Sequence, residues 1–179
     1  IYVYAASFHG KKLLALGGNS GNPIFDWFIG RELNPRIGEF DIKTFNELRP
    51  GLILWALLDI SCVCHQYTKF GWVSDSIVLV TLFHIWYIVD SLINESTILT
   101  QMDITTDGFG FMLSVGDLAW LPFTYCLQAR FLAFHPIHLG WFGVLAILAV
   151  QFTGYYIFRV ANLEKNEFRH VRNPKGTYT

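Results

Sequence analysis

The sequence predicts an all-α, polytopic integral membrane protein, and two observations carry that prediction. Of the 179 residues, 53% are hydrophobic, 17% are aromatic and only 15% are charged, which is too apolar for an ordinary soluble domain. The apolar residues also gather into long runs separated by polar segments, as in a chain that crosses a bilayer repeatedly. The net charge of -1, without a basic stripe, gives no reason to expect nucleic acid as a partner.

Four runs approach the roughly 20 apolar residues that a spanning helix needs: 52–67, 77–93, 112–134 and 139–158. The first run is short, and Pro122 interrupts the third. Residues 1–8 are expected to be the end of a preceding span. The chain is therefore predicted to be an internal fragment with about four full spans plus the end of another, its polar tail from Lys165 onward leading into a missing carboxyl-terminal portion.

The distribution of basic residues predicts an orientation. If each run crosses once, every Lys and Arg except Lys69 and Arg130 falls on one face, which the positive-inside rule assigns to the cytosol. The loop of residues 9–50, the acidic segment 94–111 and the basic tail are then expected on that face, within reach of a cytosolic anion. This assignment depends on the number of spans, and a re-entrant segment at 52–67 would overturn it.

Ionisable residues in or beside the apolar runs are functional candidates, because a charge in hydrocarbon is costly. Asp90 and Glu95 lie on either side of a helix end, where both can face a polar cavity. Asp103 and Asp107 precede the flexible Gly108-Phe-Gly110, and spacing alone leaves open a general acid or a tight surface turn. For other residues of this kind, interhelical hydrogen bonds and snorkelling are the alternatives to a function: Asp59, His65, His84, Asp117 and Arg130.

Lys165 and Arg169 lie four residues apart, and they share one face if the last helix continues through them. Two cations so placed can bind a phosphate, although they also fit the usual basic flank of a span. Cys62, Cys64 and Cys126 all lie in apolar stretches and are expected to be free thiols. No metal site is expected, because Cys62 and Cys64 lack a second pair of ligands.

Five segments of the chain carry a further signal: residues 18–38, 47–51, 99–112, 121–130 and 165–169. In this order they resemble the sterol reductase family, and the delta-14 sterol reductases of the endoplasmic reticulum most closely. The resemblance covers nearly the whole chain, and its first segment is a family signature. Phe25 departs from the signature, which usually has Tyr or His there.

The resemblance implies an NADPH-dependent, multi-pass enzyme of the endoplasmic reticulum membrane that reduces the C14=C15 double bond of a sterol. By resemblance, residues 9–50 are a cytosol-facing signature loop, and residues 159–179 begin the NADPH-binding half. Lys165 and Arg169 match the pair that contacts the NADPH phosphates. The reaction needs a protein acid to protonate the alkene, and the candidates are Glu95, Asp103 and Asp107, with Asp90 behind them.

Three alternatives remain open at this level. A sister enzyme that reduces the delta-7 or the side-chain double bond would share the signature of residues 21–36. A lamin-receptor-like protein of the inner nuclear membrane would carry the same transmembrane module behind a chromatin-binding domain. Intramembrane acids and histidines alone would also suit a transporter, but the sequence has no inverted repeat.

Overall fold

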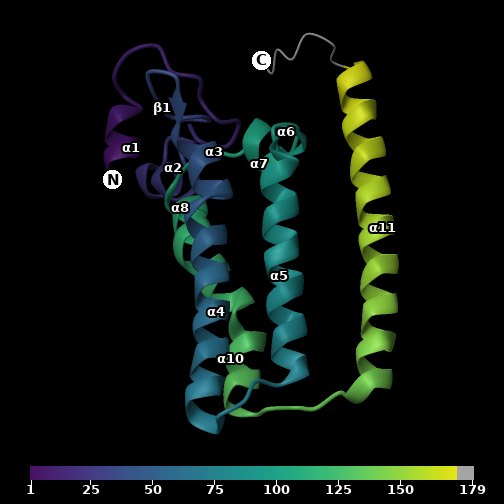
Figure 1. Ribbon diagram of the computed structural model, residues 1–179. Helices are drawn as coiled ribbons and strands as arrows, with labels where there is room; N and C mark the ends of the chain where they lie inside the picture. Colours follow the sequence, from purple (N-terminus) through teal and green to yellow (C-terminus); the bar gives the residue numbers. More distant parts are fainter. Residues whose placement is uncertain (173–179) are drawn as a thin grey trace. The chain divides into compact units, whose positions relative to one another are not determined.

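The computed structural model describes residues 1–172, with side chains up to residue 169, and it consists almost entirely of helices (Figure 1). In chain order the elements are α1 (Tyr2–Ala6), α2 (Pro23–Ile29), β1 (Arg36–Ile37), β2 (Phe40–Asp41), α3 (Ile42–Leu48), α4 (Pro50–Phe70), α5 (Asp75–Ile93), α6 (Glu95–Ile98), α7 (Met102–Thr105), α8 (Phe111–Val115), the π-helical turn η1 (Gly116–Trp120), α9 (Leu121–Tyr125), α10 (Leu127–Phe134) and α11 (Gly140–Arg172).

Within the described residues, three helical stretches are long and apolar enough to cross a membrane. They are Ile42–Phe70, which joins α3 to α4, Asp75–Ile93, which is α5, and Gly140–Arg169 of α11. None of the apolar window of α11 is buried, so its side chains suit contact with lipid. These stretches confirm the predicted class, a multi-pass helical membrane protein.

The third apolar run, residues 112–134, does not form one continuous helix. It is divided among α8, η1, α9 and α10. Pro122 has no amide proton to donate to the helical ladder, and η1 interrupts the regular α-helical bonding just before it. The break that the proline suggests is therefore real, and it leaves three uninterrupted spans rather than four in the part of the chain that the structure describes.

The chain divides into two compact units. The first unit comprises Ile1–Trp55 and Ser91–Tyr125, and so contains both the signature loop and the acidic segment. The loop is ordered by local hydrogen bonds: the Asn22 side chain accepts from the amides of Ile24 and Phe25 at the start of α2, and Asp41 accepts from Thr44 at the start of α3. Between these helices, β1 and β2 form a small antiparallel hairpin.

The second unit comprises Ala56–Asp90 and the described residues from Cys126 onward. Its core gathers Ile77 of α5 with Leu132 and Ala133 of α10, and side chains of α4 pack against them. Gln66 of α4 is fully buried there, where its amide donates to the Leu132 carbonyl at 2.7 Å and its oxygen accepts from the Ser74 amide at 2.7 Å. Both polar groups of Gln66 are thus satisfied inside an apolar bundle.

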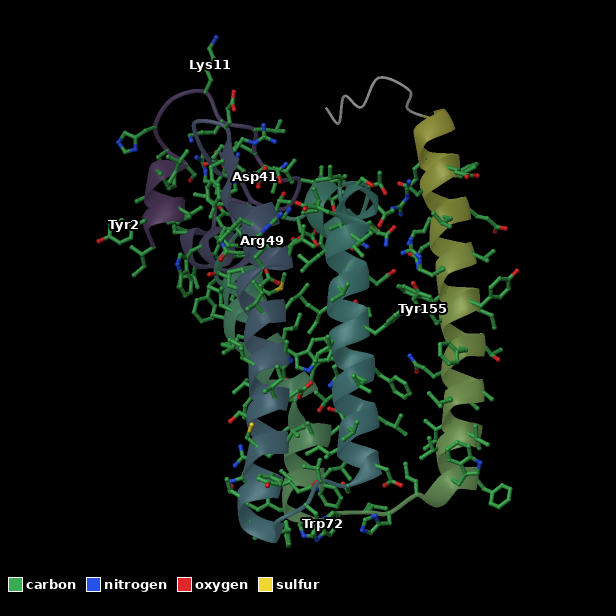
Figure 2. All side chains as sticks on the ribbon, in the orientation of Figure 1. Tyr2, Lys11, Asp41, Arg49, Trp72 and Tyr155 are labelled. Carbon is green, nitrogen blue, oxygen red and sulfur yellow. The ribbon has the colours of Figure 1, made fainter. Side chains whose placement is uncertain are left out.

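Asp75 sets the start of α11 relative to the start of α5. Its carboxylate accepts from the backbone amides of Leu139 and Gly140 at 3.0 and 3.1 Å. The two helices therefore begin side by side, and Tyr155 of α11 projects toward α5 (Figure 2).

Candidate functional site

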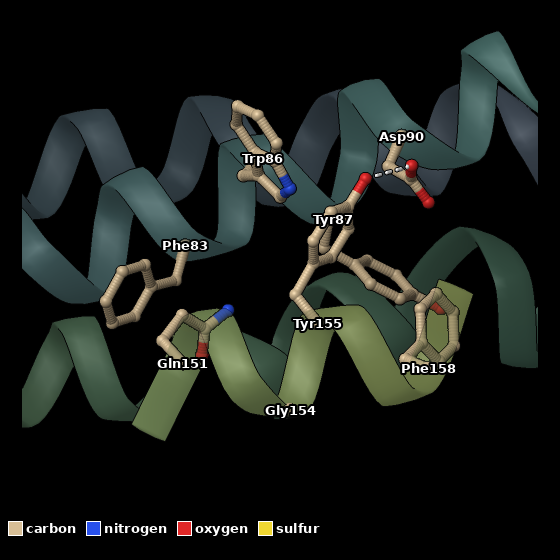
Figure 3. A pocket seen from close by; sticks show the side chains of 8 residues that line it. All are labelled: Phe83, Trp86, Tyr87, Asp90, Gln151, Gly154, Tyr155 and Phe158. Atoms are coloured by element: carbon tan, nitrogen blue, oxygen red, sulfur yellow. Dashed lines mark hydrogen bonds between the residues drawn. The ribbon is translucent and has the colours of Figure 1, made fainter. Parts of the chain in front are cut away.

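A pocket of about 190 Å³ lies between α5 and α11 (Figure 3). Each helix contributes four residues spaced i, i+3, i+4 and i+7, a pattern that places all four on one helix face. The two faces lie opposite each other, because Asp75 ties the helices together at their starts and Tyr155 reaches Asp90 across the gap further along. The lining residues are Phe83, Trp86, Tyr87 and Asp90 of α5, and Gln151, Gly154, Tyr155 and Phe158 of α11.

One end of this pocket is polar. The Tyr155 hydroxyl donates to Asp90 Oδ1 at 2.9 Å, and Arg159 Nη1 donates to Asp90 Oδ2 at 3.1 Å. The Asp90 and Arg159 side chains are only 11% and 17% exposed. A carboxylate in a spanning helix is tolerated when it is paired and hydrogen-bonded, and these two contacts meet that requirement.

The rest of the pocket is largely aromatic. Trp86 meets Tyr155 edge to face, with ring centroids 5.5 Å apart, and the Tyr87 and Phe158 rings lie 6.4 Å apart. Gly154 leaves open space, since a Cβ atom there would have no heavy atom within 4 Å. The pocket therefore offers aromatic faces to an apolar ligand and one hydrogen-bonding end to a polar group.

Lys165 and Arg169 follow on the same helix as Tyr155. The helix continues to Arg172, so the condition that places these two cations on one face is met. Lys165 is exposed and Arg169 is half-buried. At about 1.5 Å per residue, they lie roughly 9 and 15 Å beyond Arg159 along the axis of α11. Residues 173–179, the end of the predicted NADPH-binding segment, lie outside the described residues.

The two family segments of the first unit meet at three glycines. A Cβ atom on Gly30 would collide with the backbone from Gly108 to Gly110, and Cβ atoms on Gly108 and Gly110 would collide with the backbone around Gly30. The Phe109 amide also donates to the Glu32 carbonyl at 3.1 Å, and Trp27 packs on Phe111 with ring centroids 4.7 Å apart. These glycines are thus sites of close backbone packing rather than flexible joints.

Lys43, which no sequence pattern marks as a functional residue, joins α3 to the acidic segment. The residue is fully buried, and its ammonium group donates to the carbonyl oxygens of Ile104 and Asp107 at 3.2 and 2.5 Å. Asp107 therefore contributes its backbone to this contact, and its side chain accepts from the Thr106 hydroxyl at 3.3 Å. Asp103 is exposed. The sequence gives only one sign of this role, which is that Lys43 is the one cation in the short amphipathic stretch of α3.

The remaining predicted acid, Glu95, forms an ion pair with Arg49. The two guanidinium nitrogens donate to its two carboxylate oxygens at 2.8 and 3.2 Å. Both side chains are about one-third exposed. Asp90 and Glu95, which were expected to share a cavity, have different partners instead, Tyr155 with Arg159 for Asp90 and Arg49 for Glu95.

The charged residues of the signature loop do not form one shared network. Glu32 pairs with Lys12 at 3.1 Å, and Arg36 pairs with Asp41 at 3.1 Å. Asp26 accepts from both the hydroxyl and the amide of Ser20, at 2.7 and 2.8 Å, and these hydrogen bonds hold the pKa of Asp26 below its usual value. The loop is thus held by separate local contacts, which agrees with a structural role for its charges.

Other carboxyl groups are buried among the helices. Asp59 of α4 is completely buried and lies 2.7 Å from His84 Nδ1 of α5. In the first unit, Glu47 Oε1 and Asp117 Oδ2 are buried without a hydrogen-bond partner in the part of the chain that the structure describes. An unpaired carboxyl in such a place favours its neutral form. Glu47 was not among the candidate acids, because nothing in its spacing distinguishes it from a surface glutamate.

These features define a class: a polytopic helical membrane protein with a mainly aromatic intramembrane pocket that has one polar end. The chain belongs to the ergosterol biosynthesis ERG4/ERG24 family, whose family model matches residues 1–179.

Curated relatives agree with this assignment. The chain is 66% identical over 173 residues to the delta(14)-sterol reductase erg24 of Schizosaccharomyces pombe. This alignment covers 96% of this chain and 41% of that protein. It is 56% identical over 191 residues to the delta(14)-sterol reductase ERG24 of Saccharomyces cerevisiae, covering 99% of this chain and 44% of that protein. The delta(14)-sterol reductase of Ascobolus immersus is 57% identical over 175 residues, covering 94% of this chain and 41% of that protein. The chain thus spans about two fifths of the length of these relatives.

Proposed function

We propose that the protein containing this chain is an NADPH-dependent delta-14 sterol reductase of the endoplasmic reticulum membrane. The observation that carries the proposal is identity of 66% to a curated delta(14)-sterol reductase across nearly the whole chain. At such identity the intramembrane pocket and its lining are expected to serve the same class of substrate. The substrate is then a sterol with a C14=C15 double bond, and the product is the saturated sterol.

The reaction adds one proton and one hydride across the double bond. A protein acid protonates C15, which leaves the positive charge on C14, the more substituted carbon. NADPH, when bound, supplies the hydride for C14 and leaves as NADP⁺. Because an alkene is a poor base, the protein must present a carboxylic acid in a dry site and surround the developing cation with aromatic faces.

The residues of this chain fit one part of the cofactor. Lys165 and Arg169, one turn apart on α11, can hold phosphate oxygens, because an ammonium and a guanidinium are both strong donors to phosphate. They supply nothing for the nicotinamide or the adenine ring. We assign them the NADPH phosphates, as the family resemblance implies.

The contacts of the candidate acids rank them as proton donors. Both carboxyl oxygens of Asp90 and of Glu95 already accept hydrogen bonds, so neither group presents an oxygen that can carry a proton to the substrate while these contacts last. Asp103 is exposed to water, and Asp107 is half-buried beside Thr106. Asp107 therefore remains the best supported of the four, and Glu47 and Asp117 join it because each has a buried carboxyl oxygen without a partner in the described part of the chain.

Sterol analysis in a fungal strain that lacks its own delta-14 sterol reductase tests the proposal. Expression of the full-length protein is expected to remove the accumulated delta-14 unsaturated sterols and to restore the normal product. A strain that lacks a delta-7 reductase serves as the control and should be unchanged. Rescue of that control strain alone would assign the protein to the sister reaction instead.

A further inference from the structure

We propose that the polar end of the α5–α11 pocket is the subsite for the 3β-hydroxyl group of the sterol, with the Tyr155 hydroxyl group, oriented by Asp90, as its hydrogen-bonding partner. This inference rests on the proposed function and adds to it the orientation of the substrate. It is carried by the size of the pocket, by its polarity and by the hydrogen-bonding capacity of the two side chains.

The pocket is too small for a whole sterol. Sites that enclose a drug-sized ligand usually have volumes of about 300 Å³ or more, whereas this pocket has about 190 Å³. It therefore holds one end of a four-ring molecule. The aliphatic side chain of a sterol would gain nothing from a carboxylate and a phenol, so the end that fits is the ring that bears the hydroxyl group.

The polarity of the pocket follows the direction of α5. Asp90 lies three residues before the end of the helix at Ile93, about 4.5 Å along the axis. Phe83 lies two turns deeper, opposite the neutral amide of Gln151 (Figure 3). A sterol in a bilayer has its hydroxyl group near the headgroups and its rings in the hydrocarbon. The pocket presents the matching order, with its charged end toward the helix terminus and aromatic walls within the span.

Tyr155 has the hydrogen-bonding capacity that a hydroxyl ligand needs. It gives its own proton to Asp90, and the Trp86 side chain also hydrogen-bonds to the Tyr155 hydroxyl group, so the phenol oxygen keeps one further lone pair to accept from a ligand. A sterol hydroxyl group both donates and accepts, so it can donate to this oxygen, which Asp90 orients by accepting the phenol proton. Arg159 holds the Asp90 carboxylate in place and acts as a positioning residue.

This orientation separates Asp90 from the chemical step. In a sterol, the 3β-hydroxyl and the C14=C15 bond lie toward opposite ends of the fused rings. Asp90 and Tyr155 would therefore govern sterol binding, and loss of their contacts should not change the step that protonates the alkene. A proton donor at Asp90 would give the opposite result.

Two substrates and two tyrosine variants of the full-length enzyme test the subsite. The substrates are a delta-14 sterol and its 3-deoxy analogue. Wild-type enzyme is expected to prefer the hydroxylated sterol by about 10- to 100-fold in kcat/KM, the usual range for one hydrogen bond to a charged network. With the hydroxylated sterol, Tyr155→Phe should lower kcat/KM by that factor, through a higher KM. With the deoxy analogue, the kcat/KM of Tyr155→Phe should equal that of the wild type. Tyr156→Phe, on the 68% exposed neighbouring residue, is the matched control and should behave as wild type.

Each contrary result has its own meaning. Equal loss on both substrates with Tyr155→Phe, or a raised KM for NADPH alone, would overturn the subsite. If Tyr155→Phe does not fold, Asp90→Asn provides the same comparison, with thermal unfolding as the check on folding. If wild-type enzyme reduces neither sterol, the proposed function fails, and displacement of a labelled sterol by the two compounds still measures whether the pocket prefers the hydroxyl group.

Discussion

The backbone of Gly30 lies directly against that of Gly108, so that a methyl group on Gly108 would overlap the Gly30 carbonyl group. Gly30 also has a φ of 102°, which residues with a Cβ atom rarely adopt. The signature loop and the acidic segment are therefore two sides of one contact. Their sequences are constrained together because neither backbone can move away while Phe109 is hydrogen-bonded to Glu32.

Gly108→Ala is expected to destabilise the first unit by about 2 kcal/mol or more, because backbone atoms rather than a flexible side chain block the new methyl group. Thermal unfolding of the detergent-solubilised protein measures the change. Gly116→Ala is the matched control, since a Cβ atom there meets nothing within 4 Å. Equal stability of the two variants would show that the close glycine contact does not exist.

Lys43→Met should cost about 1–3 kcal/mol, because it leaves the carbonyl groups of Ile104 and Asp107 buried without their donor. The apolar part of the side chain is kept, so the loss reports the hydrogen bonds. Faster proteolysis of the acidic segment is the expected sign, together with a lower unfolding temperature. Lys11→Met, at an exposed loop position, should change neither quantity.

Asp26 should make the stability of the signature loop depend on pH in the acid range. Its folded pKa lies below the unfolded value of about 3.9, so its stabilising effect is complete above that value and is lost as the pH falls through the folded pKa. The protection of the Ser20 amide from hydrogen exchange, measured relative to the rate in an unstructured peptide at the same pH, is expected to fall over this window in the wild type. Asp26→Asn should remove the dependence, and Glu39→Gln, at an exposed position, should retain it. A Ser20 amide whose protection does not change with pH would contradict the assignment.

Glu95→Gln should leave kcat within about threefold of the wild-type value. An ion pair whose side chains are about one-third exposed contributes only about 0–1 kcal/mol, and the Glu95 carboxyl group accepts hydrogen bonds in it rather than donating one. Steady-state reduction of a delta-14 sterol by the full-length enzyme is the measurement. Arg49→Gln removes the other partner and should have an effect of the same small size. A loss of activity by a factor of hundreds in Glu95→Gln alone would identify Glu95 as the proton donor.

Gly154→Leu should fill the α5–α11 pocket without disturbing the fold, because a Cβ atom at this position meets no heavy atom within 4 Å. We expect an unchanged unfolding temperature and at least a tenfold weaker binding of sterol. Val150→Leu, on the 74% exposed surface of the same helix, is the control and should bind sterol normally. Normal sterol binding by a folded Gly154→Leu protein would show that the pocket does not take the substrate.

Long hydrophobic runs and the helix-breaking proline were enough to predict the class of the fold. Helices need only local hydrogen bonds, so long apolar stretches near residues 52–67, 77–93 and 139–158 already indicate the spans that the structure contains. Pro122 likewise indicated the break in the run of residues 112–134. The exact ends of the spans differ, since α11 continues well past the apolar run to Arg172.

The pairing of residues distant in sequence depended on the tertiary structure. Asp90 lies close to Glu95 in sequence and was expected to share a cavity with it. In the structure, Asp90 instead accepts hydrogen bonds from Tyr155 and Arg159 of α11, whose start is held beside that of α5 by Asp75. Lys43 had no distinguishing pattern, because its role is to donate to backbone carbonyls, which every sequence possesses.

The sequence by itself determined that this is a helical membrane protein of the sterol reductase family. Long apolar runs indicate helices in lipid, and the family motifs are recognised from the order of the residues alone. Only the tertiary structure decided which acids are paired and which face a pocket. The reason is physical: the state of a carboxyl group depends on the donors and water around it, and those come from helices whose packing no local pattern specifies.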